Sequence, residues 1–160
     1  MRPVRAVLGA LVALAVFAAA GAAGAAGTQT ILVTSVTVLV RSHDVGPKGP
    51  SKGDTVVVRD QLLNAASQFG RKKGDTVGAD SATVTLSSAN AATIEGRATL
   101  PGGTITISGS VTPLANGGLI APVTGGTGAF QHVQGTLTVG PGKNRALNTY
   151  RLTRSTGLTA

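Results

Sequence analysis

The chain has 160 residues, which suits a single domain, and only 2% of them are aromatic. A hydrophobic core must therefore come from Val, Ile, Leu and Ala, which favours strands rich in β-branched residues over a binding groove lined with rings. Charged residues make up 12% of the chain, which argues against a charged, disordered protein. The sequence contains no cysteine, so disulfide bridges, thiol chemistry and cysteine-bound metals are excluded.

The formal net charge is +8, and +6 remains once residues 1–26 are removed. A basic exported protein can be retained on anionic cell-surface polymers or acidic glycans. The alternative is that the charge only keeps a weakly charged chain in solution. Nucleic acid is not an expected partner, because no set of aromatic side chains accompanies the basic residues to stack on bases.

Residues 1–26 are typical of a secretory signal peptide. Arg2 and Arg5 give a basic start, residues 6–20 form an uncharged apolar run, and residues 23–26 are the small residues that a signal peptidase accepts. A retained membrane anchor is the alternative, since an apolar run of this length can just span a bilayer. Alanine and glycine gain little from lipid. We therefore expect cleavage, a secreted protein in an extracellular or periplasmic space, and no stable membrane insertion of the mature chain.

Alternating polar and apolar residues predict a series of short strands. The predicted strands cover residues 28–42, 54–64, 81–88, 91–100, 104–112, 136–139 and 145–153. Residues 65–80 contain several glycines and are expected to form a turn, a short irregular strand and another turn, and residues 113–122 a loop. We predict an all-β fold, a closed antiparallel β-barrel of about eight strands, because closure leaves no unpaired edge in a chain without disulfides. The barrel domain is expected to cover residues 28–154 and a frayed tail residues 155–160.

A glycine-rich segment precedes the strand at residues 136–139. Gly125, Gly126 and Gly128 indicate backbone that needs a positive φ or the close approach of another segment. We expect a turn here that forms one of the closures of the barrel. A phosphate-binding loop is disfavoured, because the segment lacks the required Lys and Ser or Thr and leads into a strand rather than a helix.

Asp60 is the candidate site residue that the pattern singles out. In the strand at residues 54–64 it shares the even-numbered, apolar face with Val56, Val58 and Leu62, so it should point into the barrel. A carboxylate in such a place can anchor a ligand or act as an acid or base. The structural alternative is that Asp60 only completes a hydrogen-bond network with strand hydroxyls such as those of Thr83 or Thr85.

Other chemistry has little support. The only histidines, His43 and His132, do not have the spacing of metal ligands, so no metal is expected, and no cofactor either. A hydrolase is disfavoured because the chain has no G-x-S-x-G or comparable nucleophile motif.

The segment Val123-Thr124-Gly125-Gly126-Thr127-Gly128-Ala129-Phe130 resembles the V-x-G-G-[ST]-G-x-[FY] stretch of the allene oxide cyclase and dirigent superfamily. Residues 53–64 and 70–85 resemble its second strand and the turn into its third, and the whole resemblance covers residues 36–152 in order. It implies a barrel of that type in a secreted, bacterial-type member. Superfamily members tend to be trimers, so a homotrimer is a candidate assembly.

The resemblance also bears on Asp60, which falls where the plant cyclases have a pocket Asn that helps hold a catalytic water, and near an inward Asp of dirigents implicated in handling a quinone methide. The plant cyclases carry an inward Glu on the first strand and a Cys on the third, whereas this chain has only Ser, Thr and aliphatic residues at 30–40 and no Cys. Its mature part has few rings, namely Phe69, Phe130 and Tyr150. The reaction of the plant allene oxide cyclases is therefore not expected.

Three functions remain open. The leading hypothesis is a barrel that binds or guides a small apolar or phenolic molecule in its interior. The second is an isomerase or cyclase with Asp60 as acid or base, and the third is a structural or cell-surface barrel without a ligand. The candidate catalytic residue is Asp60, and the candidate ligand contacts are Asp60, Val58, Leu62, Phe130 and Tyr150.

Overall fold

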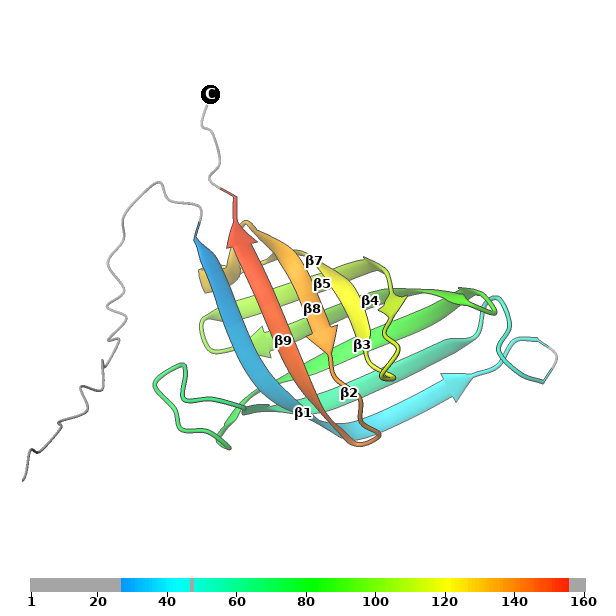
Figure 1. Cartoon of the computed structure of the whole chain (residues 1–160), viewed down its shortest axis with the longest axis horizontal. Coiled ribbons are helices and arrows are strands. Elements are labelled where there is room, and N and C mark those ends of the chain that lie inside the picture. The colour runs from blue at the N-terminus through cyan, green and yellow to red at the C-terminus, as the bar shows by residue number, and fades with distance from the viewer. Residues whose placement is uncertain (1–26, 47, 156–160) are drawn as a thin grey trace, which may run out of the picture.

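The computed structural model describes residues 27–46 and 48–155, which form nine β-strands and one short 3-10 helix (Figure 1). In chain order the elements are β1 (Thr28–His43), β2 (Thr55–Asn64), β3 (Thr76–Ser88), β4 (Ala91–Leu100), β5 (Gly103–Ser110), β6 (Thr112–Pro113), β7 (Leu119–Gly126), η1 (Gly128–Phe130), β8 (Val133–Val139) and β9 (Arg145–Arg154). The expected signal peptide and residues 156–160 of the expected tail lie outside the described residues. Within the described ranges, no helix is both long and apolar enough to cross a membrane.

The strands form a closed barrel. Hydrogen-bonded neighbours follow the order β5-β4-β3-β2-β1-β9-β8-β7, and β5 also pairs with β7, so eight strands complete the circle. The short β6 is an addition that pairs with β7, and all the pairs are antiparallel. The predicted closed antiparallel barrel is therefore confirmed. Each of the eight strands has a partner on both sides, which stabilises a sheet that has no disulfide.

The core is mainly aliphatic, as the low aromatic content predicted. Phe130 and Tyr150 are the rings in its fully buried part. Its buried members are Ile31, Val33, Leu62, Val77, Ile94, Ala98, Leu100, Ile105, Ile107, Ala121, Val123, Phe130, Val133, Leu137, Tyr150 and Leu152.

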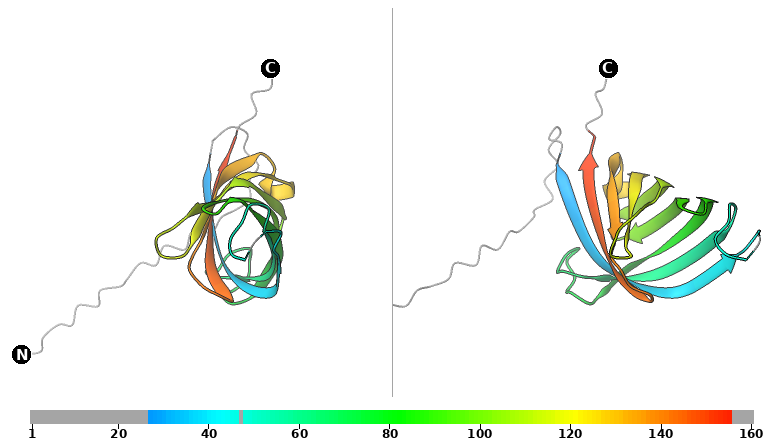
Figure 2. Two further views of the ribbon diagram at one scale, coloured as in Figure 1. Left: turned by 90° about the vertical axis from the view of Figure 1, so that its right-hand side faces the viewer. Right: turned by 45° about the vertical axis from the view of Figure 1, so that its right-hand side comes forward.

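One side of the barrel has longer strands than the other. β1 has 16 residues and β3 has 13, whereas β5 and β7 have 8 each and β8 has 7. Figures 1 and 2 show β1 to β4 curving past the ends of the shorter strands. The inner face of this extension lacks opposite strands to cover it, and Val40 near the end of β1 is 56% exposed.

The expectation for residues 65–80 was wrong in its second half. β3 begins at Thr76 and continues through Gly78 and Asp80, where a turn was expected. Gly78 does not form a turn. A Cβ atom at this position would overlap the carbonyl oxygen of Thr99, so the glycine allows β3 and β4 to approach closely.

The expected loop at residues 113–122 was also too long. β7 begins at Leu119 and contains Gly125 and Gly126, which therefore lie in a strand rather than in a turn. The expected closure is confirmed at this place, since Gly126 pairs with Ile105 and Gly125 with Thr106 where β5 meets β7. Close approach and positive φ are illustrated by Gly126 and Gly128.

Gly126 is needed for close approach. A Cβ atom there would overlap the carbonyl oxygen of Thr104 and would lie 2.6 Å from that of Phe130. Gly128 is needed for its φ of +60°, which starts the 3-10 turn that brings the Phe130 ring into the core.

Candidate functional site

Asp60 points into the barrel, as its strand pattern predicted. Its neighbours Arg59 and Gln61 are exposed, whereas Leu62, two residues further along the same face, is fully buried. The Oδ1 atom of Asp60 is buried and has no hydrogen-bond partner among the described residues. A buried carboxylate oxygen without a partner is energetically costly, so this atom has an unused capacity to accept a hydrogen bond.

Asp80 lies directly opposite Asp60. The two residues are partners in the register of β2 and β3, and directly opposite residues present their side chains on the same face of a sheet. The next partner of Asp80 is Ala98 on β4, which pairs in turn with the buried Ile105 on β5. The paired side chains of Asp60, Asp80, Ala98 and Ile105 therefore all face inward. Two of the six acidic residues of the chain meet inside the barrel.

The pKa of Asp80 is raised from 3.8 to about 7. Burial is the larger cause, and the charge of Asp60 is the second. A carboxyl group with a pKa near neutrality can exchange a proton at ordinary pH, which is the property required of a general acid or base. The sequence analysis missed Asp80 because residues 65–80 were expected to end in a turn. Extending the even-numbered inward face of residues 81–88 by one step would have found it.

Tyr150 on β9 is the third member of an inward-facing polar cluster, with Asp60 and Asp80. Its side chain is fully buried, and its hydroxyl has no hydrogen-bond partner among the described residues. Burial raises the pKa of Tyr150 well above its usual value, and the charges of Asp80 and then Asp60 add to the effect. The hydroxyl therefore remains protonated and can donate a hydrogen bond to a ligand.

Small residues stand beside the two carboxylates. The inward positions of β3 and β4 next to Asp80 are Ala82, Gly96 and Ala98. A Cβ atom at Gly96 would lie 3.0 Å from that of Ala82, so this part of the wall has little side-chain volume. Bulky residues here would fill the space in front of the acids.

Part of the inward surface remains accessible. We call it the accessible inner wall, and it consists of half-buried, inward-facing residues of β2 and β3. These residues are Val56, Val58, Asp60, Asp80, Ala82 and Val84. By contrast, Leu62 and Ala98 are fully buried. The wall thus combines apolar side chains with two carboxylates, which suits a small molecule that is apolar but carries one polar group.

The other predicted contacts occupy different places. Val58 belongs to the accessible inner wall next to Asp60, and Leu62 belongs to the buried core. Phe130 is also buried in the core, in η1, whose main contacts are with β5. The register therefore brings Asp60 and Val58 together with Asp80. Leu62, Phe130 and Tyr150 are all buried in the core, and Tyr150 differs from the other two in its hydroxyl, which has no hydrogen-bond partner among the described residues.

The alternative role of Asp60 in a network with Thr83 or Thr85 is wrong. These residues pair with Val57 and Thr55, on the opposite face of the sheet from Asp60. Their hydroxyls therefore point away from the interior.

Asp60 does not line either of two pockets that the described residues form. One, of about 770 Å³, lies where β1 begins and β9 ends; the other, of about 410 Å³, lies beside His132 and Gly125. No group of three or more His, Cys, Asp or Glu side chains suited to a metal occurs within residues 27–46 and 48–155.

Comparison with known proteins gives no matching family model and no matching curated relative. Solved structures do match. A pyocyanin demethylase is 26% identical over 79% of this chain and 100% of its own, with a TM-score of 0.63. A pterocarpan synthase dirigent protein is 16% identical over 88% of this chain and 92% of its own, with a TM-score of 0.58.

A Diels-Alderase from Streptomyces koyangensis is 16% identical over 83% of this chain and 68% of its own, with a TM-score of 0.59. At these identities the dirigent protein and the Diels-Alderase establish similarity of fold. The chain therefore folds as a barrel of the allene oxide cyclase and dirigent type.

Proposed function

We propose that this protein is an exported barrel that binds a small apolar or phenolic molecule in its interior and guides its reaction. The observation that carries the proposal is the cluster of Asp60, Asp80 and Tyr150, whose polar atoms face inward beside apolar residues. Val56 and Val58 would contact the apolar body of the ligand. Asp60 would accept a hydrogen bond from its polar group, and the Tyr150 hydroxyl would donate one.

The similar solved structures support a small-molecule function. Their names refer to a demethylase of pyocyanin, a pterocarpan synthase and a Diels-Alderase, which are barrels that act on or guide small organic molecules. The accessible inner wall supports the same function, because it keeps carboxylates and aliphatic side chains side by side within reach of solvent.

An isomerase or cyclase is the second candidate, with Asp60 as acid or base. The observation that favours it is the second carboxyl group, since the pKa of Asp80 is about 7 and Asp60 lies opposite it. Two facing carboxyls of this kind can exchange one proton with a bound molecule. Asp60 and Asp80 would then move the proton, and Tyr150 would stabilise negative charge that develops on an oxygen.

Export and assembly belong to the same proposal. Residues 1–26 would direct secretion and would be removed, which N-terminal sequencing of the exported protein tests directly. A homotrimer would cover exposed apolar side chains such as Val38 and Leu147, which are 66% and 49% exposed. Sedimentation analysis of the purified protein tests this assembly.

The functional test uses two aromatic probes, pyocyanin and the simple phenol 1-naphthol, each titrated into the purified protein. Binding is expected to weaken about three- to tenfold in each variant, because Asp60→Asn replaces a charged acceptor by a neutral one and Tyr150→Phe removes one hydrogen bond to the ligand. Asp44→Asn is the matched control, since Asp44 is exposed on the loop after β1. Equal affinity in all four proteins would exclude the interior site.

Turnover separates the two candidates. An enzyme would lose its product formation in Asp60→Asn, whereas a binding barrel would show weaker binding and no product in any variant. A protein that binds neither probe, and in which Asp60→Asn changes only the stability, would be a structural barrel without a ligand.

A further inference from the structure

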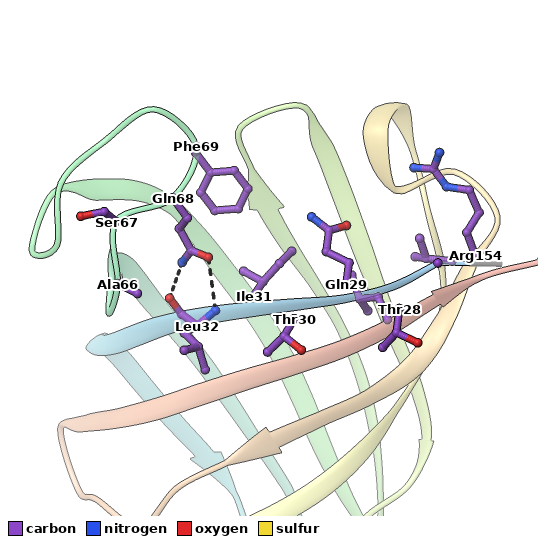
Figure 3. Close-up of a pocket in the computed structure, with 13 residues that line it drawn as sticks. Thr28, Gln29, Thr30, Ile31, Leu32, Ala66, Ser67, Gln68, Phe69 and Arg154 are labelled. Atoms are coloured by element: carbon purple, nitrogen blue, oxygen red, sulfur yellow. Dashed lines mark hydrogen bonds between the residues drawn. The ribbon is translucent and has the colours of Figure 1, made fainter. Parts of the chain in front are cut away.

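A second site lies at the end of the barrel where β1 begins and β9 ends. The pocket there has a volume of about 770 Å³, within the range of small-molecule sites (Figure 3). Its floor is made by the core residues Ile31, Val133 and Leu152. Asp60, Asp80 and Tyr150 do not line it, so it is separate from the acidic cluster.

The loop between β2 and β3 overhangs this pocket and is held firmly in place. The side chain of Gln68 accepts a hydrogen bond from the backbone N–H of Leu32 at 3.4 Å and donates one to the carbonyl oxygen of Leu32 (Figure 3). Asn64 Nδ2 donates to the carbonyl oxygens of Gln68, Arg71 and Lys72 at 2.9, 3.2 and 3.2 Å. The overhang is therefore preorganised.

Phe69 occupies the tip of the overhang in an unusual conformation. It has a φ of +56°, followed by Gly70 with +65°, and backbone bonds of 3.2 and 3.0 Å between Gln68 and Arg71 close the two-residue turn. Such turns favour Asn, Asp or Gly, and a bulky residue with positive φ is strained. The Phe69 ring packs against the core on the side of β1 that carries Ile31 and Gln29, and this packing offsets the strain of the turn (Figure 3).

The pocket has a positive charge at one end. Of the described residues that line it, Arg154 alone is charged, and it lies across the pocket from Phe69 (Figure 3). Arg154 Nη2 donates to the carbonyl oxygen of Ala129 at 2.6 Å, which positions the guanidinium and leaves most of its five N–H donors for a ligand.

We propose that this pocket is a binding site for a small amphipathic anion. The apolar body of the ligand lies on Ile31 and Leu152 beneath the Phe69 ring, and its carboxylate or sulfonate group pairs with Arg154. A strained aromatic residue on a preorganised loop and a positioned guanidinium fit such a ligand better than a neutral one.

The test compares two dyes with the same ring system. The anion 8-anilinonaphthalene-1-sulfonate carries a sulfonate group, whereas N-phenyl-1-naphthylamine lacks it, and the fluorescence of both dyes reports binding. Arg154→Gln is expected to weaken the binding of the anionic dye about three- to tenfold and to leave the binding of the neutral dye unchanged. Arg151→Gln, on the same strand and exposed but outside the pocket, is the matched control and should change neither.

Phe69→Asn tests the overhang, because asparagine tolerates a positive φ and the fold is retained without the ring. We expect both dyes to bind more weakly to this variant than to the wild type. Chemical-shift changes on dye binding should fall at residues 28–32 and 66–69. Equal affinity of the anionic dye for Arg154→Gln and Arg151→Gln, shifts gathered around Asp60, or no binding at all would overturn the proposal.

Discussion

Asp60 and Asp80 face each other across the β2–β3 pair with both side chains on the inner face of the barrel. Burial and the charge of Asp60 raise the pKa of Asp80 to about 7. The fold thus keeps two carboxyl groups side by side in an interior that is otherwise mostly aliphatic. Such an arrangement destabilises the protein when both groups are ionised, and under the proposed function the same pair would bind the ligand or move a proton.

The first prediction concerns the pH dependence of stability. The pKa of Asp80 is about 7 in the folded protein and 3.8 as a model value, so between these pH values the folded state binds more protons than the unfolded state. The contribution of Asp80 is therefore most favourable below about pH 4 and is lost as the pH rises through 7. Asp80→Asn should raise the free energy of unfolding at pH 8, by up to about 4 kcal/mol, and have little effect near pH 4.

Urea unfolding of the wild type and Asp80→Asn at pH 4 and pH 8 measures this difference, with Asp44→Asn as an exposed control. A variant whose stability differs from the wild type by the same amount at both pH values would contradict the raised pKa.

The second prediction concerns the hydroxyl of Tyr150. This group is buried without a hydrogen-bond partner among the described residues, so removing it should cost the folded protein little or stabilise it by about 1 kcal/mol. Tyr150→Phe keeps the ring and its packing. Thermal unfolding of the two proteins tests this, and a loss of more than about 1 kcal/mol would show that the hydroxyl is already satisfied.

The third prediction compares two adjacent glycines at the closure of the barrel. A Cβ atom at Gly126 would overlap the carbonyl oxygen of Thr104, whereas a Cβ atom at Gly125 would have no atom within 4 Å. Gly126→Ala should therefore destabilise the protein by about 3 kcal/mol or more, through overpacking in a closed sheet. Gly125→Ala should be neutral or slightly stabilising. Chemical denaturation measures the free energy of unfolding of both variants. Equal changes in the two would mean that β5 and β7 are less close than described.

The fourth prediction concerns the loop that overhangs the pocket near β1. Asn64 is 2% exposed and its amide donates three hydrogen bonds to carbonyl oxygens of that loop. Asn64→Ala should lower the free energy of unfolding by about 2 to 3 kcal/mol and increase amide hydrogen exchange at residues 68–72. Asn90→Ala in the exposed turn after β3 is the control and should change neither. Unchanged exchange in Asn64→Ala would show that Gln68 alone holds the loop.

The alternation of side chains in the sequence was sufficient to predict most of the strands and the inward direction of Asp60, whereas closure of the barrel was predicted from the lack of disulfides and from the family resemblance. Residues 91–100 were predicted as a strand with the bounds that β4 has, because both faces alternate without interruption. The prediction failed at Gly78, Gly125 and Gly126, which lie in strands. Gly78 and Gly126 pack closely against a neighbouring backbone, whereas Gly125 pairs with Thr106 and has open space around it, and the sequence alone does not distinguish these uses of glycine from a turn.

By itself, the sequence determined a set of strands with a mainly aliphatic inner face and a carboxylate at position 60 on that face, because these properties follow from a period of two along each strand. Only the tertiary structure decided that Asp80 and Tyr150 join Asp60, and that Phe69 and Arg154 border one pocket. These residues come from strands and loops far apart in the chain. Their meeting depends on strand register, closure and turn geometry, which side-chain alternation does not encode.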